Sequence, residues 1–324
     1  MAESFWVIGP GQGTIRSERL GPLAPGSVRV RAVASAVSRG TERVVFEGRV
    51  PNSERIRMRC PFQEGNFPAP VKYGYASVGV VEEGNPDLLG KRVFCLYPHQ
   101  SRYDVPADRV IAVPDAVPSG RATLAANLET AITALWDGNP GVGDRIVVVG
   151  GGLIGTFVAI LASGIPGACV ELIEPSEARA AALLELGLPV VSPGAAMGEA
   201  DVVFHASGQP AGLASALGLA GTEATVVELS WFGDATVGLA LGEAFHAKRL
   251  TVKSSQVGTV PAGRRSRWSS RRRLCLALEL LRDPLFDRVI GDEVPFDRLP
   301  LVMPRLLGAS DGAPGAVVHY PETG

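Results

Sequence analysis

One stretch restricts the fold of this chain more than any other, the run "RIVVVGGGLIG" at residues 145–155. Four β-branched residues lead into a turn with glycines at 150, 152 and 155, and an apolar stretch follows. A buried strand, a tight turn and a helix, in that order, explain this pattern. Repeated units of this kind build a parallel sheet, so the run predicts an α/β fold.

The three glycines have separate expected roles. Gly150 permits the tight turn, Gly152 lets the backbone approach a pyrophosphate, and Gly155 lets helix and strand pack closely. Leu153 and Ile154 complete the motif and open the helix, whose free N–H groups attract phosphates. A single G-x-G-x-x-G match is a weak signal in a chain with 39 glycines. Its place between a strand and a helix makes it a predicted dinucleotide site.

A carboxylate follows about one strand later. The next β-like run ends at Glu174 in "VELIEPSEAR". A carboxylate there can accept hydrogen bonds from both ribose hydroxyls of an adenosine and would repel a 2′-phosphate. Glu174 therefore favours NAD over NADP as the cofactor.

The rest of the chain divides into three parts. Residues 1–120 consist of short Val-rich runs separated by Gly, Pro and Asp, which is typical of a compact antiparallel barrel or sandwich. From 121 to 260 a predicted helix over 121–138 leads into alternating strands and helices, which predicts a doubly wound parallel sheet. Residues 261–324 hold a basic stretch, a helix and a short β-like end, and we expect them to return to the first domain.

The composition of the chain limits the classes of partner that we expect. The chain has 324 residues, 46% of them hydrophobic, and a net charge of −2, which favours a small-molecule partner over nucleic acid. Its four cysteines lie far apart without a C-x-x-C pair, so we expect a reducing, cytoplasmic setting. The N-terminus lacks the pattern of a signal peptide. Residues 146–170 carry no charge, yet their glycines and Pro166 favour strand, turn and helix over a membrane span.

At this point the chain resembles a family. The β-rich first part, "GVGDRIVVVGGGLIG", the acidic end of the second strand, "DVVFHASG" and the "LALELL" tail are similar to the medium-chain dehydrogenase/reductase superfamily. Within it, "SRGTE", "KYGYASVG" and "LYPHQ" resemble the branch that contains bacteriochlorophyllide dehydrogenase. The resemblance implies an N-terminal GroES-like β-barrel domain, a C-terminal Rossmann domain and nicotinamide-dependent hydride transfer in a homodimer or tetramer. It also implies that Ser207, Ser230, Ser255 and Gln256 line the cofactor.

The pattern departs from the zinc-dependent members of that superfamily. Where they carry a cysteine in a C-G-[ST]-[DE] turn, this chain has Arg39, with Thr41 at the hydroxyl position; where they carry a His-Glu pair, it has Tyr75 and Ala76. Only Glu129 keeps a ligand type. Since a catalytic zinc needs three protein ligands of N, S or O type, we expect no metal.

Another group must then handle the alcohol proton. Tyr75 is one candidate, because a phenol can donate to a developing alkoxide and a cation such as Lys72 or Arg39 could lower its pKa. Thr41 could relay the proton, and His99 could handle one as well. Alternatively, Arg39 could pair with Glu129, and Tyr75 could only fill the space of the lost ligands.

Six arginines within residues 264–273 form a second unusual feature. They could bind the phosphate or carboxylate of an anionic substrate, with Trp268 stacking on a ring; a solvated loop or a subunit contact is the alternative.

Three functions remain open. The first is a zinc-independent NAD(H)-linked oxidoreductase that interconverts a secondary alcohol and a ketone on a ring-bearing or polyhydroxylated metabolite. The second is a metal-free quinone or enone reductase. The third is a protein that binds NAD(H) without catalysis, as a sensor or scaffold.

Overall fold

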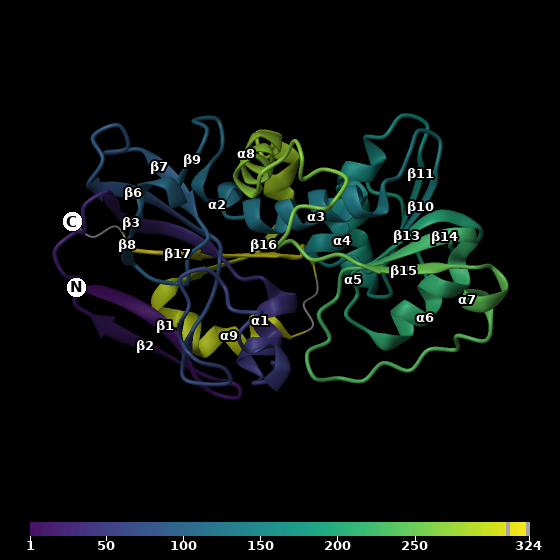
Figure 1. Cartoon of the computed structure of the whole chain (residues 1–324), viewed down its shortest axis with the longest axis horizontal. Helices are drawn as coiled ribbons and strands as arrows, with labels where there is room; N and C mark the ends of the chain where they lie inside the picture. The colour runs from purple at the N-terminus through teal and green to yellow at the C-terminus, as the bar shows by residue number, and fades with distance from the viewer. Residues whose placement is uncertain (309–311, 322–324) are drawn as a thin grey trace. The chain divides into compact units, whose positions relative to one another are not determined.

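The computed structural model describes residues 1–308 and 312–321. The chain divides into two compact units (Figure 1). Unit 1 holds Met1–Ala126 and most of the described residues from Leu278 onward, and unit 2 holds Asn127–Ala277. The chain therefore returns to unit 1 at Leu278, whereas the sequence placed this return at 261. Arg273 explains the difference, because its ion pair with Glu129 ties the intervening segment to unit 2.

Unit 1 is built on two sheets. The smaller one has the order β2-β1-β5-β4, and the larger one has the order β16-β17-β3-β6-β7-β9, with β8 pairing with β3. The strands are β1 (Ala2–Gly9), β2 (Gln12–Glu18), β3 (Ser27–Ala36), β4 (Glu64–Gly65), β5 (Val71–Lys72), β6 (Ser77–Glu83), β7 (Arg92–Cys95), β8 (Arg102–Pro106), β9 (Ile111–Ala112), β16 (Ile290–Pro295) and β17 (Gly315–His319).

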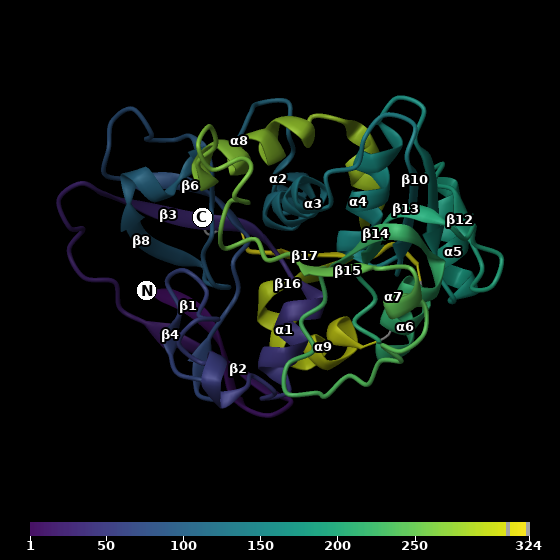
Figure 2. The ribbon, with the colours of Figure 1, turned by 45° about the vertical axis from the view of Figure 1, so that its right-hand side comes forward.

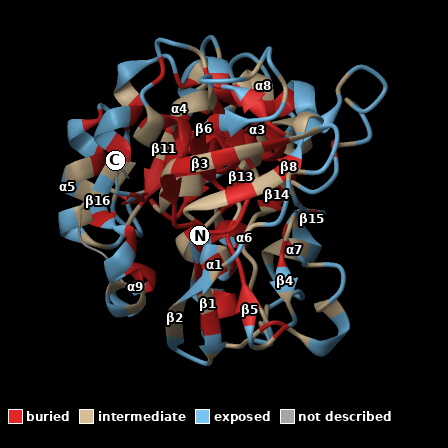
Figure 3. Ribbon diagram, turned by 90° about the vertical axis from the view of Figure 1, so that its left-hand side faces the viewer, coloured by how far each residue is buried: buried red, intermediate tan, exposed pale blue. Residues whose placement is uncertain are grey.

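Strand β3 lies at the centre of the larger sheet. Its sequence "SVRVRAVASA" alternates partly buried and buried positions, as expected for a strand with one face on the core. It pairs antiparallel with β6, β8 and β17. Figure 3 shows buried and partly buried residues along β3. The short, mostly antiparallel strands form the GroES-like β-barrel domain expected from the sequence.

The helices of unit 1 are α1 (Arg39–Phe46), α2 (Ser119–Ala122) and α9 (Leu299–Leu307). The single helix expected over 121–138 is wrong in one respect, because it is split into α2 and α3 (Ala125–Gly138). At the break the Thr123 hydroxyl donates to the carbonyl of Gly120, and the Leu124 N–H bonds three residues back to Arg121. These tighter bonds end α2 before α3 begins.

Unit 2 contains a six-stranded parallel sheet with the order β12-β11-β10-β13-β14-β15. Figure 2 shows its strands β10, β12, β13, β14 and β15. Its strands are β10 (Arg145–Val149), β11 (Cys169–Ile173), β12 (Val190–Val191), β13 (Ala200–His205), β14 (Ala220–Glu228) and β15 (Thr251–Ser254). Its remaining helices are α4 (Leu153–Ser163), α5 (Glu177–Glu185), α6 (Pro210–Leu219), α7 (Ala244–Ala247) and α8 (Ser270–Leu280), the last of which crosses the division between the units. This is the predicted doubly wound Rossmann sheet.

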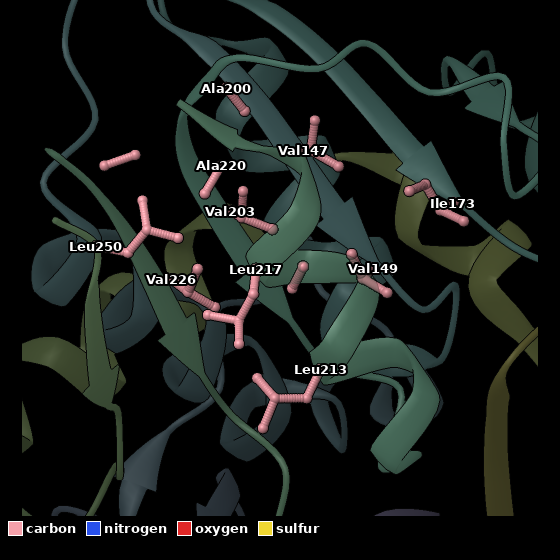
Figure 4. Packing of buried hydrophobic residues seen from close by; sticks show 12 residues of the cluster. Val147, Val149, Ile173, Ala200, Val203, Leu213, Leu217, Ala220, Val226 and Leu250 are labelled. Atoms are coloured by element: carbon pink, nitrogen blue, oxygen red, sulfur yellow. The ribbon is translucent and has the colours of Figure 1, made fainter. Parts of the chain in front are cut away.

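Strand alternation distributes the core of unit 2 over both faces of the sheet. On one face Val147, Val149, Val203 and Val226 pack with residues of α6, including Leu213 and Leu217 (Figure 4). On the other face Val148 lies beside Gly155 of α4, and Phe204 lies against Gly138 at the end of α3. Helices therefore cover both faces, which a parallel sheet requires.

Among the helices within residues 1–308 and 312–321, none has both the length and the hydropathy of a membrane span. The uncharged segment 146–170 instead forms β10, the glycine turn, α4 and the start of β11.

Candidate active site

The glycine turn between β10 and α4 leaves open space at one position only among its three motif glycines. Gly150 has φ of +109°, and a Cβ there would lie 2.7 Å from the backbone nitrogen of Ser207. A Cβ on Gly155 would collide with the carbonyl oxygen of Gly150. A Cβ on Gly152 would meet no heavy atom within 4 Å. The space beside Gly152 fits the close approach of a phosphate, with partly exposed Leu153 and Ile154 next to it.

Glu174 is attached to this turn. It follows β11, and its Oε2 accepts the N–H of Gly151 at 3.0 Å while its Oε1 accepts the N–H of Ser176 at 2.9 Å. An ionised carboxylate has about four lone-pair sites. It can therefore accept further hydrogen bonds from ligand hydroxyls while its orientation stays fixed by the backbone.

A polar cluster lies where the strand order reverses, between the carboxyl ends of β10 and β13. Val149 is in register with His205, and His205 is in register with Glu228 on β14. His205 Nδ1 lies 2.7 Å from Glu228 Oε2, and its Nε2 lies 2.6 Å from the Ser207 hydroxyl. In open α/β sheets, ligands bind at this point of reversal. The cluster therefore borders the predicted cofactor site.

The other predicted cofactor residues are held by internal bonds. The Ser230 hydroxyl accepts the N–H of Gly208 at 3.0 Å. Ser255 is buried, and its hydroxyl donates to Asp137 Oδ2 at 2.8 Å. Gln256 is exposed, and its Oε1 accepts the N–H of Gly258 at 2.7 Å. Ser207 and Ser230 thus gather around His205, whereas Ser255 and Gln256 follow β15.

In unit 1 the Tyr75 hydroxyl is hydrogen-bonded to two other hydroxyls. These belong to Ser38, the residue before α1, and to Thr41 in its first turn. The preceding residue, Gly74, has φ of +128°, and a Cβ there would lie 3.0 Å from the His99 ring. Only glycine suits this position, so Gly74 fixes the backbone that carries Tyr75. The structure thus brings two predicted catalytic residues, Tyr75 and Thr41, together.

The expected lowering of the Tyr75 pKa is wrong. Burial raises the pKa of Tyr75 to about 12, the hydrogen bonds from Ser38 and Thr41 act in the opposite direction, and the negative charge of Glu42 raises it further. Tyr75 is therefore a neutral phenol at physiological pH, able to donate a hydrogen bond.

Lys72 does not have the role expected for it. Its side chain is fully buried, and its ammonium group lies 2.5 Å from Gln100 Oε1, 2.5 Å from Glu64 Oε1 and 3.3 Å from Glu18 Oε2. Burial, Ser38, Thr41, Glu42 and Cys60 are the main causes of the shifted Tyr75 pKa, and Lys72 is not one of them. A buried ammonium needs such partners, so Lys72 stabilises β5 rather than the phenol.

The alternative pairing of Arg39 with Glu129 is also wrong. Arg39 binds Asp292 at 2.5 Å, within unit 1. Glu129 binds Arg273 at 2.8 Å, within unit 2, and both side chains are almost fully buried. Burial raises the pKa of Glu129, while the charge and hydrogen bond of Arg273 act the other way. Arg273 also donates to the carbonyl of Val257, so the pair holds a loop in place.

His99, predicted to handle a proton, is buried and forms part of a hydrogen-bonded chain. Its Nε2 lies 3.0 Å from Glu42 Oε2, and its Nδ1 lies 2.8 Å from the Ser35 hydroxyl. Ser35 in turn contacts the Tyr320 hydroxyl at 3.1 Å. The other oxygen of Glu42 accepts the Ser38 N–H at 2.8 Å. Glu42 thereby connects His99 to the residue that holds Tyr75.

Within residues 1–308 and 312–321, no group of three or more His, Cys, Asp or Glu side chains is placed to hold a metal ion. The positions compared with zinc ligands carry a guanidinium at Arg39 and a phenol at Tyr75. A guanidinium cannot ligate a metal because it has no acceptor. Zinc independence itself stays a prediction.

Comparisons with known proteins identify the fold of this chain through solved structures. No protein-family model and no curated sequence matches the chain. Solved structures match over nearly its whole length. L-idonate 5-dehydrogenase from Escherichia coli has a TM-score of 0.80 at 16% identity, with 98% of each chain covered. For 2R,3R-butanediol dehydrogenase from Bacillus subtilis the TM-score is 0.78 at 17% identity, with 98% of this chain and 99% of that chain covered.

A third match, an alcohol dehydrogenase from Escherichia coli solved with NADH, has a TM-score of 0.76 at 15% identity and covers 98% of this chain and 99% of its own. The chain has the medium-chain dehydrogenase/reductase fold. On this fold, the Rossmann unit carries the glycine turn, Glu174 and the His205 cluster, and the GroES-like unit carries Tyr75, Thr41 and Glu42.

Two site residues on this medium-chain dehydrogenase/reductase fold, Glu42 and Glu228, were not predicted from the sequence. Glu42 lies four residues after Ser38, the spacing at which a helix side chain can return to the residue that starts the helix, and this signal was available. Glu228 ends a β-like run as His205 does, so strand register could have paired them. Neither spacing is specific enough to identify a site by itself.

Proposed function

We propose that this chain is a zinc-independent oxidoreductase that uses NAD(H) to interconvert a secondary alcohol and a ketone on a ring-bearing or polyhydroxylated metabolite. The observation that carries the proposal is the glycine turn after β10 with the Glu174 carboxylate bound to its Gly151 amide. The fold shared with dehydrogenases over 98% of the chain supports it.

The turn and its surroundings would hold the cofactor. The open space at Gly152 and the N–H groups at the start of α4 suit a pyrophosphate. Glu174 suits the ribose hydroxyls, and its negative charge would repel the 2′-phosphate of NADP. The bound nicotinamide supplies the chemistry of hydride transfer.

Tyr75 is the proposed proton donor. Because burial raises its pKa to about 12, the phenol stays protonated and can donate to an oxygen on which negative charge develops. The hydroxyls of Ser38 and Thr41 orient the phenol and provide the next positions along a hydrogen-bonded path. Donation from a positioned acid typically contributes a factor of about 10² to 10⁴ in rate.

Two residues, Glu42 and Arg39, position the start of α1 and take no part in the reaction itself. Glu42 fixes the Ser38 N–H and the His99 ring, so it holds the start of α1 against the segment carrying Tyr75. Arg39, paired with Asp292, anchors the other side of the same helix start.

The test combines cofactor binding with turnover. Purified protein should bind NADH more tightly than NADPH, and it should oxidise a secondary alcohol in a panel of cyclic and polyhydroxylated alcohols without added zinc and after chelation. Tyr75→Phe should lower turnover about a hundredfold and leave NADH affinity within about twofold. Matched Tyr97→Phe, at a buried tyrosine of unit 1, should leave turnover nearly unchanged.

Three results would reject the proposal. Reduction of enones or quinones without any alcohol oxidation would favour the metal-free C=C reductase. Tight NADH binding without hydride exchange on either panel would favour a sensor or scaffold. Dependence of turnover on stoichiometric zinc would refute zinc independence.

A homo-oligomer is a further part of the proposal. Strand β15 forms one end of the six-stranded sheet, and all four of its residues are exposed. An edge with unpaired backbone groups is suited to pairing with a second copy of the same chain.

A further inference from the structure

A pocket in unit 2 lies outside the residues assigned to the cofactor. It has a volume of about 490 Å³ and is lined by the end of α3, by β15 and by the loop before α8. The lining residues that matter here are Trp136, Asp137, Asn139, Lys253, Arg264 and Arg267. None of the glycine-turn residues, nor Glu174, belongs to it. We call it the Trp136 pocket.

The charges in the Trp136 pocket do not balance. Lys253 is paired with Asp137, since its ammonium lies 3.2 Å from Asp137 Oδ1 and donates to the Asp137 carbonyl at 2.7 Å. Asp137 also accepts from the Ser255 hydroxyl. This pairing leaves the guanidinium groups of Arg264 and Arg267 as the excess charge. The pocket is therefore cationic, although the chain as a whole carries a net charge of −2.

The Arg264 guanidinium has N–H donors available for a ligand. Its guanidinium makes no hydrogen bond or ion pair with any residue that the structure describes, and it lies over the Trp136 ring at 5.5 Å. Among residues 1–308 and 312–321, the Arg267 guanidinium makes one hydrogen bond, a long one of 3.3 Å to the carbonyl of Gly263. Two guanidinium groups with unused N–H donors match the oxygens of a phosphate.

The aromatic wall of the pocket is packed against further side chains. Trp136 packs against Trp268 with ring centroids 4.8 Å apart, and Arg272 lies over Trp268 at 3.9 Å. Arginine, tryptophan, tryptophan and arginine thus follow one another in contact. This order fixes the Trp136 ring beside a space much larger than a phosphate, and an indole beside an open space suits a flat ring.

We propose that the Trp136 pocket binds a small organic phosphate that carries an aromatic ring, with Arg264 and Arg267 on the phosphate and Trp136 against the ring. This site does not depend on the proposed function, because it shares no residue with the glycine turn or with Tyr75. It gives part of the arginine cluster a ligand-binding role rather than that of a solvated loop.

Calorimetric titration at low salt tests the proposal, with phenyl phosphate, inorganic phosphate and phenol as probes and with NADH present at saturation. Phenyl phosphate should bind saturably, and more tightly than either inorganic phosphate or phenol. Arg264→Gln should weaken it at least about tenfold, the effect of losing one charge-assisted hydrogen bond. Arg267→Gln should weaken it several-fold.

Arg265→Gln is the matched control. Arg265 is the next residue in the chain, but its guanidinium donates to the carbonyl of Val260 and does not line the pocket. Its substitution should leave the affinity within about twofold. Three outcomes would overturn the proposal: no saturable binding, equal losses for Arg264→Gln and Arg265→Gln, or saturable binding that is seen only when NADH is omitted. Equal affinity for inorganic phosphate and phenyl phosphate would show that the pocket does not recognise an aromatic ring.

Discussion

Glu42 Oε2 lies 3.0 Å from His99 Nε2, and both side chains are almost completely buried. The pair is therefore a structural one, and its loss would leave a polar group in the interior without its partner. Through the Ser38 N–H, Glu42 also fixes the start of α1. Loss of the pair should therefore disturb the position of the Tyr75 hydroxyl, which is hydrogen-bonded to Ser38.

Replacing His99 should destabilise the protein. His99→Asn leaves Glu42 buried without its partner, and breaking a buried pair costs about 3 kcal/mol or more. Urea unfolding followed by fluorescence measures this loss. His319→Asn is the control, because His319 pairs with Glu293 on the surface, where a pair contributes less than about 1 kcal/mol. Equal effects of the two substitutions would contradict the structural role of His99.

Glu129 and Arg273 should behave as a unit. Arg273→Met should cost about 3 kcal/mol, since it strands a buried carboxylate. Adding Glu129→Leu should recover much of that loss, because the double variant leaves no buried charge behind. Denaturation of the two single variants and the double variant measures the coupling. Strictly additive losses, or a Glu129→Gln variant that is stable but inactive, would point instead to a catalytic Glu129.

The glycine turn predicts two different outcomes for two similar changes. Gly152→Ala adds a methyl group where no atom lies within 4 Å, so stability should stay unchanged while NADH affinity falls about tenfold. Gly155→Ala forces its methyl group onto the Gly150 carbonyl and should cost about 1 to 3 kcal/mol. NADH fluorescence titration and thermal unfolding separate these effects. Normal NADH affinity in Gly152→Ala would remove the turn from cofactor binding.

All five tyrosines should resist ionisation. Burial is the largest cause that raises each of their pKa values above 10, to about 12 for Tyr75 and further for the others. Since the folded pKa values exceed the unfolded ones, the phenols favour the folded state below pH 10. That contribution is lost as the pH rises through the folded values.

Ultraviolet absorbance of phenolate against pH checks the tyrosines. The native protein should show almost no phenolate at pH 10, whereas the chain in guanidinium chloride should titrate near pH 10. Circular dichroism should show unfolding becoming easier above about pH 10. A native titration centred at pH 10 would mean that the phenols are exposed.

The exposed edge of β15 predicts a dimer. Val252→Glu places like charges where two copies would pair, and this should weaken association at least about tenfold, as measured by light scattering over a dilution series. Arg249→Glu, an exposed change outside the strand, is the control. Pairing at the edge extends the sheet sideways and adds nothing over its faces, so Lys253 stays available to the Trp136 pocket. A monomeric native protein would exclude this interface.

Much of the fold follows from local patterns. Strand β10 was predictable because four β-branched residues precede glycines, and α6 because the stretch between two β-like runs is long enough for a crossover helix. Helices α1 and α9 were not predicted. The "RGTERVVF" segment of α1 contains a glycine and two adjacent valines, which have low helix propensity, and α9 contains Pro304. Tertiary packing, rather than local helix propensity, makes these two segments helical.

The site was only partly predictable for a related reason. Gly150, Gly152, Gly155 and Glu174 belong to one contiguous strand-turn-helix-strand unit, so their spacing carries the information. The partners of Arg39, Lys72 and Glu129 come from distant parts of the chain. Asp292 lies 253 residues from Arg39, and Arg273 lies 144 residues from Glu129. Charge type alone could not choose among the available partners.

The pairing of β17 with β3 sets an order of events during synthesis. Val318 lies opposite Ser35 in the larger sheet of unit 1, so this sheet cannot be completed until the ribosome has made the whole of unit 2. Unit 2 is nearly continuous in sequence and can fold while the chain is still growing. Until β17 arrives, the edge of β3 that it covers stays open, and a nascent chain stalled in this interval would be prone to pair with another strand.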